Sequence, residues 1–442
     1  MNKLQILKRR IKEKDFSTTS KIAIKNSSWQ LATNLTAKLG SLIFTIILAR
    51  LLAPELYGLY GLALSTILFL AIFSDLGISQ ALITYLSKTI DKKPKKAKSY
   101  FYYLTKLKVY LLLLTSFLLI ILARHLSNFY NKPIYLALVA GAIYLPLVQI
   151  TSHLNTIFTS KNNFKIQFAK EILLQILRIT IVPLSILFFL QQITKQDIYL
   201  FYLFLIISLC YLIAFIFMII LTKLNHPFNK NKSIKLTQKE KKELKKFALP
   251  LTITALSGVF FGYIDTIMLG YFVPAIQIAY YKASFDLITS AATILGFLAI
   301  SLHPILSRLK GQKLESLFSK SKKFTILISV IATIITIILS SPLIKIVYGE
   351  QYIPAIPLLK WFSLLLLTFP LINLYSTYFI SQKQTKVVSN ALITSTVLNI
   401  IFNYIFIKIG LIYSISAAVL GVCLATILTR FIYLGMLMWK RK

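Results

Sequence analysis

The chain has 442 residues, 57% of them hydrophobic and 14% charged, and its mean hydropathy is +0.74. Apolar runs long enough to cross a bilayer core of about 30 Å recur along it, which excludes a soluble globular protein. The net charge is +37. The Lys and Arg residues lie mostly between the apolar runs and no RNA-binding signature is present, so the charge indicates membrane topology and contacts with anionic lipids, with no nucleic acid partner.

Twelve apolar segments along the chain are predicted to be transmembrane helices, which makes it an all-α polytopic membrane protein. They form an N-terminal six-helix lobe, 28–222, and a C-terminal six-helix lobe, 248–442. A basic cytoplasmic arm, 1–27, precedes the first lobe, and a basic cytoplasmic linker, 223–247, joins the two. In chain order the predicted helices are 28–50, 58–78, 107–124, 133–158, 170–190, 198–222, 248–272, 283–307, 324–348, 355–380, 387–408 and 413–438.

The distribution of Lys and Arg predicts the orientation of these helices. With the N-terminus in the cytoplasm, 39 of the 50 Lys and Arg residues fall in cytoplasmic segments and 7 in outer segments. Lys108 counts as cytoplasmic and Lys282 as outer. Positive residues are enriched in cytoplasmic loops of membrane proteins, so both termini are expected in the cytoplasm. The remaining Lys and Arg residues, within predicted helices, are Lys38, Arg178, Lys360 and Arg430.

The two lobes repeat each other at an offset of 221 residues. LARLLAPELYGLYGLALS at 48–65 aligns with LGYFVPAIQIAYYKASFD at 269–286, and FTSKNNFK at 158–165 aligns with FISQKQTK at 379–386. Because six is an even number of helices, the lobes are expected to have the same orientation, with a central cavity between them. Such a plan is typical of alternating-access transporters, by analogy alone.

A polar stripe follows the first predicted helix. Gln30, Asn34, Lys38, Ser41 and Thr45 recur at spacings of 4, 4, 3 and 4, which places all five on one helix face. Lys38 lies near the middle of the span, where a charged side chain costs on the order of 2.5–3.5 kcal/mol. The stripe is therefore predicted to line a water-filled cavity. The alternative is that Lys38 snorkels or pairs with a helix carboxylate to hold the bundle together.

The fifth and eleventh predicted helices carry matching polar faces, which are expected to line the same cavity. The offset maps Gln175 onto Thr396 and Arg178 onto Asn399, and Asn403 continues the second face. The alternative is an internal Glu171–Arg178 ion pair with a packing role. On the fifth helix the polar residues, at spacings of 4, 4 and 3, are Gln167, Glu171, Gln175 and Arg178.

Asp265 lies in the seventh predicted helix, one turn beyond Gly258 and Gly262, whose GxxxG spacing predicts close helix contact. Two roles are open for this carboxylate. It takes up a coupling proton or cation, or it is a structural partner, for example of a cationic side chain on another helix such as Lys38 or Arg178. Asp286 is predicted to begin the eighth helix as its N-terminal cap.

SDLGIS at 74–79 places a charged residue at the end of the second predicted helix. Gly77 suits a helix C-cap, and Ser79 can cap the amphipathic segment that follows, QALITYLSK. Asp75 is therefore predicted to mark a structural break before a cytoplasmic surface helix. The alternative is a gating role for Asp75.

Four stretches resemble the polysaccharide-biosynthesis flippases, which export lipid-linked oligosaccharides and belong to the multidrug/oligosaccharidyl-lipid/polysaccharide exporter superfamily. ARLLAPELYGLYGLA at 49–63 and SDLGISQAL at 74–82 resemble the first two helices of that family. FALPLTITALSGVFFGYIDTIMLGYF at 247–272 resembles the seventh, and IVYGEQYIPAIPLLKW at 346–361 resembles an outer loop. Ala53 departs from the glycine usual before the proline, and no functional loss is expected from it.

The resemblance implies two six-helix lobes around a central cavity, and a flippase that moves a polyprenyl-(di)phosphate-linked oligosaccharide from the cytoplasmic to the outer leaflet by alternating access. Lys38 and Arg178 would offset the diphosphate charge, since a diphosphate cannot cross hydrocarbon unaided. Asn34, Gln175, Asn399 and Asn403 would hydrogen-bond sugar hydroxyls. Asp265 and Asp75 are the candidates for coupling or gating.

The expected partners are the polyprenyl-phosphate-linked glycan, anionic membrane lipids, and polysaccharide polymerase or export proteins. The expected location is the inner or plasma membrane, with several spans. No cofactor or metal site is expected, because Cys210 and Cys423 lie in apolar segments and no metal-ligand spacing is present. The coupling ion, a proton or sodium, is not identified by the sequence.

Two other functions are alternatives to export of a lipid-linked glycan. The first is a cation- or proton-coupled multidrug antiporter of the same superfamily, which would require acidic residues in its cavity. The second is a membrane enzyme such as a sugar polymerase. It is disfavoured because the longest loops are Lys-rich and carry neither a His/Asp/Glu cluster nor a phosphate-binding glycine loop.

Overall fold

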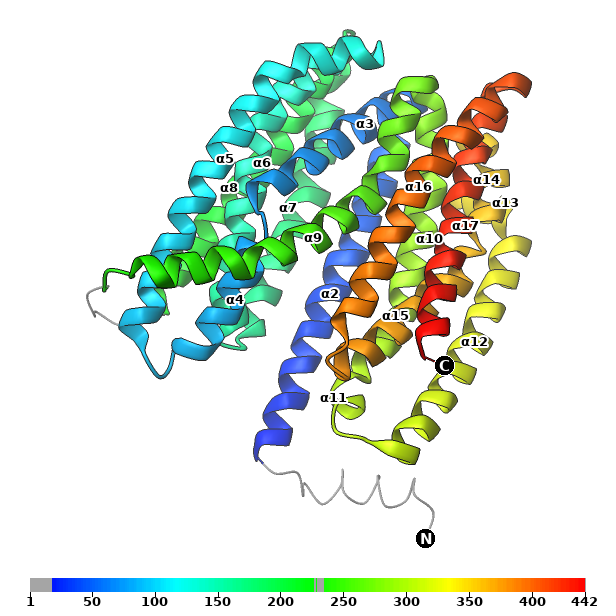
Figure 1. The fold of residues 1–442 in the computed structure, drawn as a ribbon. Coiled ribbons are helices and arrows are strands. Elements are labelled where there is room, and N and C mark those ends of the chain that lie inside the picture. The colour runs from blue at the N-terminus through cyan, green and yellow to red at the C-terminus, as the bar shows by residue number, and fades with distance from the viewer. Residues whose placement is uncertain (1–17, 226–227, 229–233, 442) are drawn as a thin grey trace.

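The computed structural model describes residues 18–225, 228 and 234–441, and within this part of the chain every regular element is a helix (Figure 1). The predicted all-α class is therefore confirmed. The α-helices are α2 (Thr18–Leu51), α3 (Pro54–Ala71), α4 (Ile78–Thr89), α5 (Pro94–Tyr130), α6 (Tyr135–Ser160), α7 (Phe164–Phe188), α8 (Gln196–Leu224), α9 (Gln238–Phe272), α10 (Ala275–Ser301), α11 (His303–Leu306), α12 (Gly311–Ile338), α13 (Ser340–Val347), α14 (Ile356–Phe362), α15 (Leu365–Ser381), α16 (Thr385–Tyr413) and α17 (Ile415–Arg441), with short 3₁₀ turns at Ile72–Ser74, Leu190–Gln192 and Glu350–Ala355.

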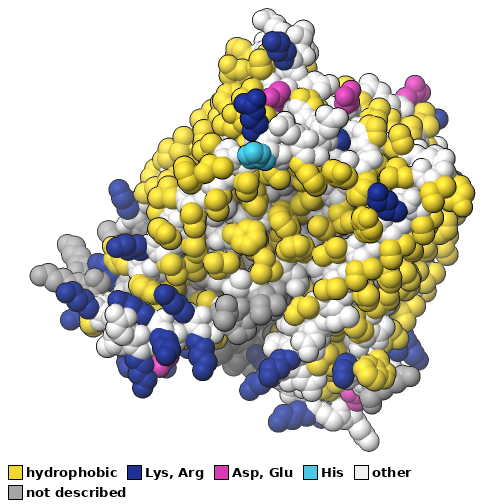
Figure 2. Space-filling view, turned by 45° about the horizontal axis from the view of Figure 1, so that its top comes forward, with side chains coloured by type: hydrophobic (Ala, Val, Ile, Leu, Met, Phe, Trp, Pro, Cys, Tyr) yellow, Lys and Arg dark blue, Asp and Glu magenta, His cyan; other side chains and the backbone are white. Residues whose placement is uncertain are grey.

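Ten of the described helices are long and apolar enough to cross a membrane, or eleven if the bent pair Glu350–Phe362 and Leu365–Ser381 counts as one span. Figure 2 shows the corresponding surface: a broad hydrophobic belt, with Lys and Arg side chains gathered along its lower edge. The chain is a multi-pass membrane protein. The number of twelve spans and the division into two lobes stay predictions. The predicted eighth span, 283–307, overlaps α10, a helix of 27 residues, but extends past the end of this helix at Ser301.

Several helices extend beyond the predicted spans, because a helix continues into water when its polar end is satisfied. α9 begins ten residues before the predicted boundary, at a capping box in which Thr237 and Glu240 bond each other's backbone N–H groups. The predicted linker, 223–247, is therefore partly helical. α2 likewise begins at Thr18, inside the predicted arm, and residues 1–17 of that arm lie outside the described part.

The 221-residue repeat recurs in the helix ends. α2 ends at Leu51 and α9 at Phe272; α3 begins at Pro54 and α10 at Ala275; α6 ends at Ser160 and α15 at Ser381; α7 begins at Phe164 and α16 at Thr385. Asn162 and Lys383, also 221 residues apart, both adopt a left-handed backbone conformation, with φ values of 54° and 62°. The same turn geometry at the same offset indicates two copies of one helical plan.

α10 lies at the centre of the bundle, where it packs against α2 and α3 from the first half of the chain and α15 from the second (Figure 1). We call α2–α8 the first half and α9–α17 the second half. The approach of α3 to α10 is close because Gly58 has no side chain, and a Cβ there would collide with the carbonyl of Ala275. A large buried core, including Tyr57, Tyr60 and Tyr281, runs through this contact.

Candidate functional site

Lys38 lies at the junction of the two halves. It is half-buried on α2, and the charges of Asp286 and Lys282 on α10 act on it. The exposure of the predicted polar stripe decreases along α2: Gln30 and Asn34 are exposed, whereas Ser41 and Thr45 are half-buried. No salt bridge joins Lys38 to a carboxylate among the described residues, and the choice between a cavity role and a pairing role for Lys38 stays a prediction.

Lys282 and Asp286 correct two predictions. α10 begins at Ala275, so Asp286 lies well inside this helix and is not its N-terminal cap, and Lys282 is not a loop residue. Their charged atoms, Lys282 Nζ and Asp286 Oδ2, lie 3.4 Å apart across one helical turn. The Lys282 side chain passes over Gly61 of α3, where the absence of a side chain leaves room. We call Lys38, Lys282 and Asp286 the junction cluster; its formal charge is positive.

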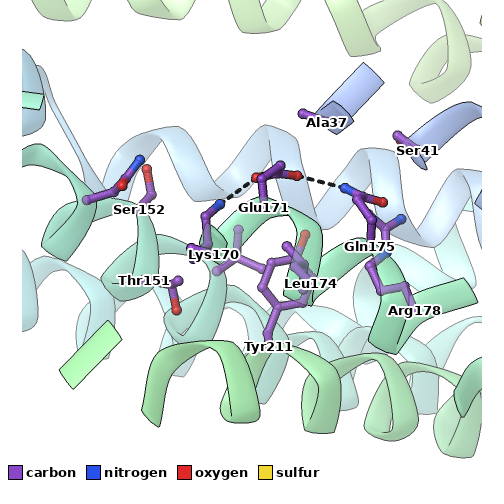
Figure 3. A pocket seen from close by; sticks show the side chains of 12 residues that line it. Ala37, Ser41, Thr151, Ser152, Lys170, Glu171, Leu174, Gln175, Arg178 and Tyr211 are labelled. Carbon is purple, nitrogen blue, oxygen red and sulfur yellow. Dashed lines mark hydrogen bonds and ion pairs between the residues drawn. The ribbon is translucent and has the colours of Figure 1, made fainter. Parts of the chain in front are cut away.

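A cavity of about 300 Å³ lies in the first half, between α2, α6, α7 and α8 (Figure 3). Gln175 and Arg178 both line it, as do Ala37 and Ser41 of α2, but Lys38 and Asn34 are not among its lining residues. Tyr211 of α8 closes the side opposite α2. The structure therefore brings together two of the six residues predicted to bind substrate.

Glu171 has partners other than Arg178, which was the partner in the alternative interpretation. Its carboxylate accepts hydrogen bonds from Lys170 Nζ at 2.6 Å and from Gln175 Nε2 at 2.7 Å (Figure 3). No ion pair joins it to Arg178 within the described residues. Arg178 instead stacks on the ring of Phe44, with its guanidinium carbon 4.0 Å from the ring centre.

Asp265, Asn399 and Asn403 form a separate network in the second half, and each is at most 4% exposed. The Asp265 carboxylate accepts hydrogen bonds from Tyr281 Oη at 2.7 Å, Thr426 Oγ1 at 2.7 Å and Asn403 Nδ2 at 2.6 Å. Asn399 lies beside Asn403, with its Nδ2 3.4 Å from Thr429 Oγ1. These asparagines bond protein groups and do not line the cavity beside Gln175 and Arg178.

One expectation about the helix that carries Asp265 is wrong. Gly258 and Gly262 mediate no close helix contact, because a Cβ built on either would meet nothing within 4 Å. Neither Lys38 nor Arg178 forms an ion pair with the Asp265 carboxylate among the described residues, so the pairing left open by the sequence is not found there. Sequence reasoning assigned no role to Arg430 of α17, a buried cation whose charge acts on Asp265 and whose Nη2 donates to the Phe261 carbonyl at 3.1 Å.

Asp75 marks the predicted break, and it also forms a buried ion pair that the sequence did not reveal. α3 and its 3₁₀ extension end at Ser74, Gly77 adopts a left-handed φ of 74°, and the amphipathic α4 follows. Ser79 is not a cap: its hydroxyl donates to Asp75 Oδ1 at 2.5 Å. Lys108 of α5, assigned to a cytoplasmic segment from the sequence, is fully buried, forms a salt bridge with Asp75 and lies 3.2 Å from Gln149 Oε1.

The two halves are also joined at the end of the bundle that carries Arg50. Arg50 Nε donates to the Val347 carbonyl at 2.8 Å, its Nη2 donates to the Ile346 carbonyl, and Lys132 Nζ donates to the Gly270 carbonyl at 2.6 Å. Each of these bonds runs from the first half to the second. Nearer the Lys-rich end, Gly258 and Gly262 of α9 face open space. The halves are thus in contact at the Arg50 end.

The comparison with known families decides the membership of the chain. The sequence profile of the family described as "Polysaccharide biosynthesis protein" matches residues 23–310, and the profile of the MatE family matches residues 250–405. The chain belongs to the polysaccharide biosynthesis protein family. The predicted resemblance to this family is therefore confirmed.

Relatives and solved structures agree with this membership. An uncharacterized membrane protein of Methanocaldococcus jannaschii is 24% identical over 90% of this chain and 81% of its own length. An inward-facing multidrug resistance transporter of the MATE family superposes with a TM-score of 0.70 at 14% identity, over 92% of this chain and 94% of the other. The lipid II flippase MurJ, in an inward closed conformation, gives a TM-score of 0.68 at 18% identity, over 93% and 87%. At these identities the superpositions show a shared fold.

Within the described residues, no group of three or more His, Cys, Asp and Glu side chains is placed to hold a metal ion. The charged groups described above are instead isolated pairs and triads inside a helical bundle, which is the arrangement that substrate or coupling-ion pathways take in transporters.

Proposed function

We propose that the protein is a flippase that moves a polyprenyl-(di)phosphate-linked oligosaccharide from the cytoplasmic to the outer leaflet by alternating access. The family membership supports an activity in polysaccharide biosynthesis. The observation that carries the proposal is the junction cluster, where two lysines and one carboxylate lie between the halves at membrane depth. A half-buried excess of cations favours an anionic substrate.

Within this proposal Lys38 and Lys282 bind the diphosphate. Asp286 holds the two ammonium groups in place before substrate arrives, and the phosphates then take over its role as counter-charge. The polyprenyl tail stays in lipid. The Lys-rich end lies against anionic head groups, so that both termini are cytoplasmic and the contact through Arg50 closes the outer side. A polymerase would act on the glycan after its transfer.

The proposal assigns the coupling ion to Asp265. The network around it consists of oxygen and amide groups, and Asn403 Oδ1 is buried without a hydrogen-bond partner among the described residues. An unpartnered acceptor beside a carboxylate suits a small cation or a proton. Asp265→Asn is expected to uncouple flipping from an imposed proton or sodium gradient while leaving substrate binding intact, and gradient-dependent flipping in that variant would contradict the assignment.

The test of the main proposal is flipping in reconstituted vesicles. Polyprenyl-diphosphate oligosaccharide is placed in the inner leaflet, and the head groups that reach an added impermeant glycosidase are counted. Lys38→Ala and Lys282→Ala are each expected to lower the rate at least tenfold, since each removes one of two charges that face the diphosphate. Lys161→Ala, which removes an exposed lysine from the α6–α7 turn, is the matched control and should flip at the wild-type rate.

The second candidate is a multidrug antiporter, which the MATE structural neighbour and the buried Asp265 favour. The same vesicles distinguish the two functions. Exchange of an organic cation for protons, with no exposure of the lipid-linked glycan, would support the antiporter and overturn the flippase.

A further inference from the structure

The cavity of the first half contains buried polar atoms that no protein group satisfies. Arg178 Nε, Gln175 Oε1 and Asn155 Oδ1 are buried and have no hydrogen-bond partner among the described residues, and all three residues line the cavity. One is a donor and two are acceptors. In native proteins such atoms are rare, and three around one space indicate a polar occupant.

The three atoms are held in position by the helices around them. The hydrogen bond from Gln175 Nε2 to Glu171 fixes the amide of Gln175, so that its oxygen is the atom left free. Stacking on Phe44 fixes the guanidinium plane of Arg178. Glu171 pairs with Lys170, and no ion pair joins Glu171 to Arg178 among the described residues. Figure 3 shows Lys170, Glu171, Gln175 and Arg178, all on α7, beside the cavity, and Asn155 belongs to the neighbouring α6.

The pattern of donors and acceptors selects the chemistry of the occupant. An anion would suit Arg178 but would face the two amide oxygens unfavourably. A hydroxyl group both donates and accepts, so a neutral sugar ring can satisfy all three atoms at once. The volume, about 300 Å³, lies at the low end of the range for small-molecule sites, which suits one ring and not a whole oligosaccharide.

We propose that this cavity binds one neutral sugar ring of the lipid-linked glycan and thereby selects which glycan is carried. The inference rests on the proposed function, since it divides the substrate between two neighbouring sites. Ala37 lines the cavity, and Lys38, the next residue of α2, belongs to the junction cluster. Successive residues of a helix are about 100° apart around its axis, so the two sites occupy adjacent faces of α2.

The first experiment measures binding of two lipids to the purified protein: a short-chain polyprenyl diphosphate carrying one neutral hexose, and the same diphosphate without sugar. Gln175→Leu is expected to weaken binding of the sugar-bearing lipid about tenfold and to leave the sugar-free lipid unchanged. Arg178→Met, a second variant in case the first folds poorly, should act in the same way. Lys38→Ala should weaken both lipids alike.

Thr180→Val is the matched control, because Thr180 lies on the exposed side of the same helix and bonds only its own backbone in α7. It should leave both affinities at the wild-type value. Equal wild-type affinity for the two lipids, or an equal loss for both in Gln175→Leu, would overturn the sugar site.

The second experiment needs no lipid. Ser152→Cys places a thiol in the cavity wall, in a background with the buried cysteines replaced as Cys210→Ala and Cys423→Ala. A neutral methyl glycoside is expected to slow labelling of this thiol by a maleimide, and Gln175→Leu should abolish the protection. Protection of the thiol in a protein that flips no lipid-linked glycan would overturn the proposed function but support the sugar site. Flipping by a protein that shows neither protection of the thiol nor a difference in affinity between the two lipids would support the proposed function and overturn the sugar site.

Discussion

The polar faces of α7 and α16 occupy equivalent places in the two halves, 221 residues apart, and they are used differently. In the first half Arg178 stacks on Phe44 and leaves an open cavity with unsatisfied atoms. In the second half Asp265 stands where the offset places Phe44, and Asn403 and Asn399 pack and bond around it. One helical plan thus supports an open polar pocket in one copy and a nearly satisfied network in the other.

The difference indicates a division of roles. Buried polar groups that bond one another make a region specific and rigid, whereas groups left open need a ligand. We therefore expect changes in the second half to affect folding and coupling, and changes in the cavity of the first half to affect substrate choice. The following variants test this comparison between the halves.

The largest effect on stability is expected at the helix break beside Asp75, which has no counterpart in the second half. α3 is interrupted at Asp75, whereas α10, its counterpart, continues as a helix to Ser301. Lys108→Met removes the buried partner of Asp75, which is expected to destabilise the protein by about 3–5 kcal/mol. The measurement is the apparent melting temperature in detergent. The double variant Lys108→Met with Asp75→Leu should recover most of the loss, and an unchanged melting temperature in the single variant would show that the pair does not hold the break.

The next prediction compares the loss of stability caused by a substitution in the second-half network with that caused by a substitution in the first-half cavity. Asp265→Val leaves the donors of Tyr281, Thr426 and Asn403 without their acceptor and is expected to destabilise the protein by about 3 kcal/mol. Arg178→Met removes a cation that forms no ion pair among the described residues, so it should change the stability by less than about 1 kcal/mol. Equal losses in the two variants, measured by thermal unfolding, would contradict the division of roles.

A smaller effect is expected where the halves meet. Arg50→Ala removes two hydrogen bonds to the last carbonyls of α13, each from a charged donor, and should shift the population towards opening at this end by about tenfold. Distances between spin labels at Phe129 and Tyr413, both exposed, report that opening. Lys161→Ala is the control and should leave the distance distribution unchanged. An unchanged distribution in Arg50→Ala would exclude Arg50 from the contact that closes this end.

The smallest effect concerns the attachment of α9 to the first half through Glu240. The hydrogen bond from Lys96, together with that from the Thr237 backbone, lowers the pKa of Glu240 to about 2. A lowered pKa stabilises the fold above the ordinary value of about 4.3, and this contribution is lost as the pH falls towards 2. The melting temperature of Glu240→Gln should therefore lie slightly below that of the wild type at pH 7 and approach it near pH 3. Glu243→Gln, on the exposed side of the same helix, should show no such convergence.

The sequence predicted which polar residues share a helix face, but it did not predict which groups that face contacts. Gln175 and Arg178 were placed on one face, and they line one cavity. Asn399 and Asn403 were also placed on one face, yet that face turns towards Asp265. Helical spacing determines which residues share a face, but the rotation of the helix in the bundle determines what the face meets.

The 221-residue offset could have placed Lys282 inside a helix from the sequence alone. The predicted helix start at 283 follows directly after Tyr280, Tyr281 and Lys282, so the prediction left Lys282 in a loop. The repeat places Ala275 opposite Pro54, the start of α3, so the offset itself locates the start of α10. With that start, the i,i+4 spacing of Lys282 and Asp286 predicts their pairing.

Composition, hydropathy and the 221-residue offset by themselves determined that this chain is a helical, multi-pass membrane protein built from two copies of one plan. These properties are readable because a membrane span is a local feature of about 20 residues. Tertiary structure alone decided that Lys108 meets Asp75, that the charge of Asp286 on α10 acts on Lys38 of α2, and that the cavity lies within the first half. Such contacts join residues on different helices, and their geometry follows from the packing of the whole bundle, which no local pattern encodes.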